Sequence, residues 1–237
     1  MSLLYHHARA FGIDLTPLQQ EQFEKYYRLL VEWNEKFNLT SITDYTGVQL
    51  KHFLDSLSAA PILLRAGVNG KNLLDVGAGA GFPGMALAIA LPDVRVTLLE
   101  ATGKKVRFLD QVTGELGLEN VMNVHGRAEE FAHDAKQRER FDFVTARALA
   151  PMPTLVEFVL PFVRVGGIFI AYKAVEAEQE TDAAQRGIET LGGRVREIIS
   201  VKLADLDDVR QLVVIDKIAR TPYVYPRAGG LPKRKPL

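Results

Sequence analysis

The chain has 237 residues, of which 47% are hydrophobic and 24% charged, a composition typical of a globular protein that buries a sizeable core. Its 29 basic residues balance 29 acidic ones, so a nucleic-acid surface would have to come from uneven placement of charge. The absence of cysteine excludes disulfides, thiolate metal ligands and a cysteine nucleophile.

The chain shows no signal for a membrane or for secretion. Its start lacks a basic stretch followed by a long apolar one, and no apolar run approaches the roughly 20 residues that a membrane span needs. We therefore expect a cytoplasmic protein without a membrane partner.

The sequence pattern of residues 1–66 predicts helices. A helix start is indicated by Thr16, Pro17 and Gln19, which supply an N-cap hydroxyl, a proline at the first helical position and the partner of a capping box. Apolar residues then recur at three- and four-residue steps and predict one buried face; they are Phe23, Tyr26, Leu30, Trp33 and Phe37.

A second apolar helix is predicted across residues 50–64, with a break or kink at Pro61 and a stop at Gly67. Helices this apolar need a surface to pack against. We therefore expect residues 1–66 to be a helical extension packed on a domain formed by residues 67–237.

In that second region short apolar strands alternate with helices. The predicted strands are Leu73–Val76, Val94–Leu99, Val121–Val124, Phe141–Thr145 and Gly167–Ala171, followed by a hairpin of Val195–Val201 and Gln211–Ile218. The predicted helices lie near residues 83–91, 103–117, 127–137, 151–163 and 176–191. This alternation predicts an α/β fold with a mostly parallel sheet, and a site at the carboxyl ends of the early strands.

The densest functional signal is the glycine-rich turn after the first of these strands. Gly77, Gly79 and Gly81 allow a sharp turn and a close approach of the backbone to a ligand. Residues 79–84 also satisfy G-x-G-x-x-G, and Glu100 follows about 20 residues later, so an NAD-dependent oxidoreductase remains an alternative.

The acidic residues near this turn favour S-adenosylmethionine over NAD. Asp75 lies at the strand tip, where a carboxylate would repel a pyrophosphate but suit a cationic ligand. Glu100 ends the second strand and can accept hydrogen bonds from both hydroxyls of a ribose, a role common to both cofactors. The chain also lacks a Tyr-x-x-x-Lys pair and an evident hydride-handling histidine.

Several segments in order resemble the motifs of the ribosomal RNA small subunit methyltransferase G family, once called glucose-inhibited division protein B. They span nearly the whole chain and are Asn34–Thr40, His52–Leu57, Asp75–Gly84, Glu100–Leu109, Gly126–Glu129, Ala146–Ala148 and the ending Tyr225–Leu237. The resemblance implies a class I S-adenosylmethionine-dependent methyltransferase with a Rossmann-like, seven-stranded, mostly parallel sheet and an N-terminal helical extension. It also implies methyl transfer to N7 of a guanosine in bacterial small-subunit (16S) ribosomal RNA.

The same resemblance implies cofactor contacts at Gly77, Phe82, Ala128, Glu129 and Arg147. Phe82 would pack against the ligand, and Ala128 and Glu129 would face its adenine. Arg147, at the carboxyl edge of the sheet, is a candidate for contacts to both the cofactor and the RNA.

Methyl transfer to guanine N7 does not require the enzyme to remove a proton. Guanine N7 carries a lone pair and no proton, so positioning and exclusion of water suffice and no catalytic acid or base is assigned. For RNA we expect Arg147, Lys173 and a basic tail that contributes Arg227, Lys233, Arg234 and Lys235. The expected partner is the small-subunit RNA or the assembled small subunit, bound by a monomer without metal.

His52, Asp55 and Ser56 lie near one helix face. We expect them to form a polar lock between the helices and the domain, with substrate contact as the alternative. Two further rival functions stay open: a class I methyltransferase acting on another substrate, and an RNA-binding protein that retains the fold without a cofactor.

Overall fold

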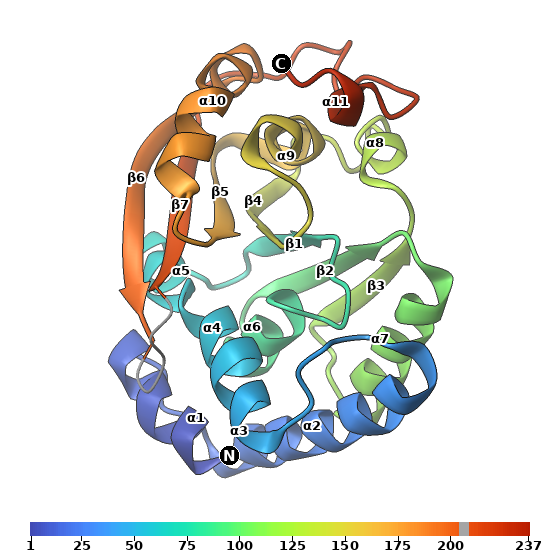
Figure 1. Ribbon diagram of the computed structural model, residues 1–237, viewed down its shortest axis with the longest axis vertical. Coiled ribbons are helices and arrows are strands. Elements are labelled where there is room, and N and C mark those ends of the chain that lie inside the picture. The colour runs from blue at the N-terminus through green and yellow to red at the C-terminus, as the bar shows by residue number, and fades with distance from the viewer. Residues whose placement is uncertain (204–208) are drawn as a thin grey trace.

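The computed structural model describes residues 1–203 and 209–237, and Figure 1 shows its seven-stranded sheet between two layers of helices. The N-terminal region contains only helical elements: α1 (Ser2–Ala8), η1 (Arg9–Phe11), α2 (Pro17–Phe37), α3 (Tyr45–Gly47), the π-helical η2 (Val48–Leu54), α4 (Asp55–Leu57) and α5 (Ala60–Ala66). The sequence patterns missed α1 because this short helix has no side-chain cap.

The start of α2 is confirmed. The Gln19 amide donates to the Thr16 hydroxyl, and the Thr16 amide donates to the Gln19 side chain, which closes the capping box. The second predicted helix is a series of short elements in the structure, with Pro61 in the first turn of α5 and Gly67 at its C-cap with φ of 81°.

The sheet agrees with the sequence-based expectation. Its strands are β1 (Asn72–Val76), β2 (Arg95–Glu100), β3 (Val121–His125), β4 (Phe141–Arg147), β5 (Val163–Lys173), β6 (Gly193–Lys202) and β7 (Val209–Lys217). The strand order is β3-β2-β1-β4-β5-β7-β6, and β7 runs antiparallel to both of its neighbours. The predicted seven-stranded, mostly parallel sheet is therefore confirmed, and the predicted hairpin supplies its one antiparallel strand.

The helices of this region are α6 (Gly84–Ala90), α7 (Gly103–Glu115), α8 (Ala128–Phe131), α9 (Met152–Val159), η3 (Leu160–Phe162), α10 (Ala177–Thr190) and α11 (Leu231–Arg234). The prediction of a helix over residues 127–137 was wrong beyond Phe131. Residues 132–137 carry no large apolar side chain to continue a buried face, and the Arg138 guanidinium donates to the carbonyls of Thr221 and Tyr225.

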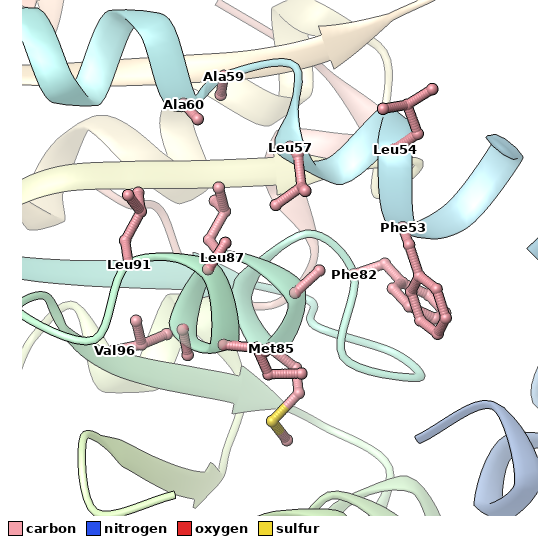
Figure 2. Close-up of a cluster of buried hydrophobic side chains, with 14 of the residues drawn as sticks. Phe53, Leu54, Leu57, Ala59, Ala60, Phe82, Met85, Leu87, Leu91 and Val96 are labelled. Atoms are coloured by element: carbon pink, nitrogen blue, oxygen red, sulfur yellow. The ribbon is translucent and has the colours of Figure 1, made fainter. Parts of the chain in front are cut away.

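Two hydrophobic clusters lie on opposite faces of the sheet. Leu73 of β1 belongs to the first and Leu74 to the second, as the alternation of a strand requires. The first cluster joins the N-terminal helices to α6 and α7; Figure 2 shows part of it, with Phe53 beside Phe82. The N-terminal helices thus pack on the sheet region through this cluster.

Candidate functional site

The turn after β1 depends on glycine at each predicted position. Gly77, Gly79 and Gly81 have φ of 74°, 62° and 95°, a region that side chains disfavour. A Cβ at Gly77 would lie 2.7 Å from a methyl of Leu149, and one at Gly81 would overlap the Tyr26 hydroxyl. The turn therefore presents backbone rather than side chains to a ligand.

Asp75 lies beneath this turn and is fully buried. Its Oδ2 accepts from the Gly84 amide at 2.8 Å and its Oδ1 accepts from the Thr145 hydroxyl at 3.1 Å. Burial raises the pKa of Asp75 to about 6. The carboxylate thus braces the turn against α6 and β4, whereas the sequence suggested that it faces the ligand.

Glu100 has a similar bracing geometry at the end of β2. Its two carboxylate oxygens accept from the Gly79 amide at 2.9 Å and the Thr102 amide at 2.8 Å, and the residue is 5% exposed. Each oxygen keeps a second acceptor position, so a ribose contact stays a prediction.

The first of three neighbouring cavities, which we name the loop cavity, lies over the glycine turn. Its lining includes Gly77, Gly79, Phe82, Lys105 and Arg147. Four of these five were predicted from the sequence, and Lys105 adds a cation suited to a carboxylate. The cavity therefore combines exposed backbone with positive charge.

Phe82 is both part of this lining and part of the packing. Its ring stacks on His52, with centroids 4.6 Å apart and an interplanar angle of 17°, and the Arg147 guanidinium lies 5.2 Å from the ring centroid. Phe82 is 6% exposed. Its role as a cofactor contact remains a prediction beside this observed packing role.

The second cavity, the β3 cavity, lies at the carboxyl ends of β1 to β3. It shares Gly77 with the loop cavity and is lined by Ala128 and Glu129, both predicted from the sequence. Its lining also includes the apolar side chains of Leu149 and Phe158. A planar apolar ring with polar edges fits such a lining.

The third cavity, which we name the cationic cavity, is the largest of the three, at about 380 Å³. Four cationic residues line it: Lys51, Arg147, Lys173 and Arg210. It shares His52, Arg147 and Ala148 with the loop cavity. Two sites of different chemistry therefore meet at the same residues.

The predicted polar lock is confirmed for two of its three residues. Arg147 Nη1 lies 2.6 Å from Asp55 Oδ2, and Arg147 Nη2 lies 3.4 Å from His52 Nδ1. The Ser56 hydroxyl donates instead to the His52 carbonyl within its own helical segment. We use the name polar lock for Arg147, Asp55 and His52, which join the N-terminal helices to β4.

His52 is uncharged within this lock at neutral pH. Burial and the neighbouring positive charge of Arg147 lower the pKa of His52 to about 4. Its Nε2 lies 2.8 Å from the Thr40 hydroxyl. A neutral imidazole therefore stands between the loop cavity and the cationic cavity.

Two predicted RNA-binding residues have partners within the protein. Lys173 Nζ lies 2.6 Å from Glu180 and donates to the Ala150 carbonyl at 2.9 Å, although it also lines the cationic cavity. Arg227 forms a bidentate pair with the fully buried Glu157, which we name the tail clasp. The clasp gives Arg227 a structural role that the sequence did not indicate.

The other tail cations differ in placement. Lys233, Arg234 and Lys235 are exposed, but Lys233 lines the β3 cavity. Arg234 donates to the Gly229 carbonyl at 2.9 Å.

Sequence reasoning missed Arg210, Leu149 and Phe158, which line the cavities. Arg210 begins the last strand far along the chain, and the two apolar residues carry no chemical signature. Only the pairing of β7 with β5 indicates that Arg210 belongs to this edge.

Within the described parts of the chain no group of three metal-binding side chains is present. No helix there is both long and apolar enough to cross a lipid bilayer.

Solved structures show that the fold is shared with class I methyltransferases. The chain resembles M. jannaschii TYW2 in complex with AdoMet, with a TM-score of 0.50 and 17% identity over 64% of this chain and 71% of that one. An rRNA methylase from Streptococcus thermophilus also gives 0.50 and 17%, over 67% of this chain and 93% of the other.

Sequence comparison is more specific. A profile of the GidB family, described as rRNA small subunit methyltransferase G, matches residues 19–212. The ribosomal RNA small subunit methyltransferase G of Dehalococcoides mccartyi (strain CBDB1) is 48% identical over the full length of both chains. That of Lactococcus lactis is 46% identical over 96% of this chain and 94% of the relative. The chain belongs to the rRNA small subunit methyltransferase G family.

Proposed function

We propose that this protein transfers a methyl group from S-adenosylmethionine to N7 of a guanosine in bacterial small-subunit (16S) ribosomal RNA. Support for the RNA substrate comes from the name shared by its full-length relatives. The proposed cofactor site spans the loop and β3 cavities, and includes Gly77, Gly79, Phe82, Ala128 and Glu129.

One observation carries the proposal: the cationic cavity adjoins the loop cavity through His52, Arg147 and Ala148. A nucleotide brings a planar base and negatively charged phosphates, so it fits a cavity lined by several cations. A base splayed out of folded RNA into the cationic cavity would meet the cofactor at these shared residues.

The cofactor fits the residues around the turn. Its ammonium and carboxylate suit exposed backbone carbonyls and amides together with Lys105 of the loop cavity, while the apolar β3 cavity suits an adenine. Asp75 and Glu100 brace the turn from below, and a direct ligand contact of either carboxylate is a further proposal.

The chemistry needs positioning rather than proton transfer. Bound S-adenosylmethionine supplies an activated methyl group on a sulfonium, and guanine N7 has no proton to remove. The protein therefore has to orient the base and exclude water, which contributes several kcal/mol in well-aligned sites. Neutral His52 and paired Arg147 serve this role, and no residue is assigned as an acid or base.

Asp55 is suited to recognise guanine. It lines the cationic cavity and is 3% exposed, and among the described residues its Oδ1 has no hydrogen-bond partner. Arg210 Nε lies 3.4 Å from that oxygen, at ion-pair distance. Guanine offers N–H donors on its Watson–Crick edge that a carboxylate accepts, whereas adenine there offers only one amino group.

For the wider RNA surface we propose Arg234 and Lys235, which are exposed on the tail, together with Arg147 and Lys173 at the cationic cavity. Arg227 and Lys233 were expected there too, but the tail clasp and the β3 cavity give them other surroundings. We propose that the protein acts in the cytoplasm as a monomer on the assembled small subunit or its RNA.

The deciding experiment is transfer of a tritiated methyl group to small subunits from a strain that lacks this gene, followed by mapping of the modified base. The proposal requires one labelled guanosine with the methyl group at N7. Label on a protein, label on another nucleotide or no label at all would contradict the proposal. Light scattering on the purified protein tests the monomer.

A further inference from the structure

The C-terminal segment, residues 226–237, folds back onto the helical layer that contains α9. Figure 1 shows α11, in dark red, beside α9 and α8. The Thr154 hydroxyl of α9 donates to the carbonyl of Pro232, which is buried. The segment therefore has a fixed position on the body of the protein.

The tail clasp holds the segment on both sides of α11. The Arg227 Nε donates to Glu157 Oε1 at 2.9 Å and its Nη2 donates to Oε2 at 2.6 Å, while the Arg227 amide donates to the same carboxylate. Its Nη2 also donates to the Lys235 carbonyl at 2.8 Å. One arginine thus connects the start of the segment to its end.

This anchoring places Lys233 at the β3 cavity. Lys233 lines the cavity together with Phe158, and its Nζ lies 5.9 Å from the centroid of the Phe158 ring. Ala128 and Glu129, proposed adenine contacts, line the same cavity. The side chain consequently presents an aliphatic stem and an ammonium group to the space between them.

We propose that residues 226–237 form a wall of the S-adenosylmethionine site and that Lys233 is a cofactor-binding residue. This inference rests on the proposed placement of the adenosine moiety in the β3 cavity. The lysine stem packs against the purine, and the ammonium donates to a purine nitrogen. The segment lies beyond residue 212, where the match to the family profile ends.

The inference divides the tail by function. Lys233 binds the cofactor, whereas Lys235, only two residues away and also exposed, does not line any of the three cavities. Both substitutions to alanine remove one positive charge from the same segment. Lys235→Ala is therefore a matched control for Lys233→Ala.

The test is isothermal titration of S-adenosylhomocysteine into the wild-type protein and its variants. We expect Lys233→Ala to raise the Kd about tenfold, as loss of a charged hydrogen bond does, and Lys235→Ala to change it less than about twofold. Lys233→Met, which keeps an apolar stem, should fall between the two. Circular dichroism melts check that each variant is folded.

Equal affinities for the Lys233→Ala and Lys235→Ala proteins, whether both normal or both weakened, would overturn the inference. The proposed function is judged separately, by wild-type methyl transfer to small subunits. If the wild-type protein does not bind S-adenosylhomocysteine, both proposals fail. If it binds and methylates but the two variants match, only the role of Lys233 fails.

Discussion

The polar lock and the tail clasp are built from the same chemistry but have different surroundings. In each, an arginine lies 2.6 Å from a carboxylate that is almost or completely buried. Each also connects a terminal region to the helices or strands around the sheet. Arg147 of the lock lines both the loop cavity and the cationic cavity, whereas Arg227 of the clasp lines none of the three.

The number of internal partners explains the difference. Arg227 binds both oxygens of Glu157 and the Lys235 carbonyl through Nε and Nη2, so two of its three guanidinium nitrogens are used within the protein. Arg147 makes a single short contact to Asp55 with Nη1 and only longer contacts to Lys51 and His52. A buried arginine pair thus indicates a ligand site only where donors remain and a cavity adjoins them.

The largest expected effect is on stability at the clasp. Arg227→Ala leaves Glu157 buried without its cation, which costs about 3–5 kcal/mol of unfolding free energy. Urea denaturation measures this loss. Below the unfolding transition and at saturating S-adenosylmethionine, which offsets any loosening of the segment that carries Lys233, the variant should keep most of its methyl-transfer activity per folded molecule. A stable but inactive variant would place Arg227 in the functional site and remove the contrast with the lock.

The next effect is the pH dependence of the lock. Because the folded-state pKa of His52 is about 4, below its ordinary value near 6.5, the unfolded chain takes up the proton first as the pH falls. Neutral His52 therefore contributes fully to the free energy of unfolding above about pH 6.5. As the pH falls towards 4 this contribution is lost, and the loss amounts to about 2–3 kcal/mol at pH 4.5.

His52→Gln should lack this loss, as urea unfolding at pH 7 and 4.5 would show. Asp75 acts in the opposite direction, because its folded pKa of about 6 lies above its ordinary value, so its contribution falls as the pH rises from about 4 to 6. That contribution is present in both proteins and cancels in the comparison. If the unfolding free energies of the wild type and His52→Gln changed equally with pH, His52 would not be the residue responsible for the loss.

Replacing Arg147 of the polar lock by lysine tests whether function needs the guanidinium itself or only its positive charge. Arg147→Lys keeps the pairing with Asp55 but loses the planar donors shared between two cavities, so methyl transfer should fall about tenfold or more. Stability should fall by less than about 1.5 kcal/mol. The matched Arg227→Lys protein should keep its activity. Equal losses of activity in both lysine variants would show that the two pairs do not differ.

The smallest expected effect concerns the exposed tail cations. Removing one phosphate contact with Lys235→Ala should weaken RNA binding modestly and lower the slope of log K against log salt by about 0.7–1. Filter binding across a salt series measures the slope. An unchanged slope would remove Lys235 from the RNA surface.

The glycine turn shows how much of a site local sequence can reveal. Three glycines with positive φ, a strand before them and a helix after them form one continuous segment, so its backbone geometry was predictable. The side chains around it were less predictable. Asp75 and Glu100 were predicted to contact the ligand, and in the structure both carboxylates accept hydrogen bonds from backbone amides of the turn and its neighbours.

The tail gives the opposite result. Its positive charge suggested one RNA-binding surface, but its cations have three different environments: the clasp for Arg227, the β3 cavity for Lys233, and solvent for Lys235. The partner of Arg227 is 70 residues away, on α9. Charge count alone does not distinguish these environments.

Sequence by itself determined the order of the strands, the capping box of α2, the glycine turn and the family, because each depends on residues close together in the chain or on motifs in order. Only the tertiary structure decided which cations face a ligand. Arg147, Arg210 and Lys233 reach their cavities through strand pairing and through the packing of α11 on α9. Such contacts between distant segments leave no local pattern, since they depend on the burial and pairing of the whole fold.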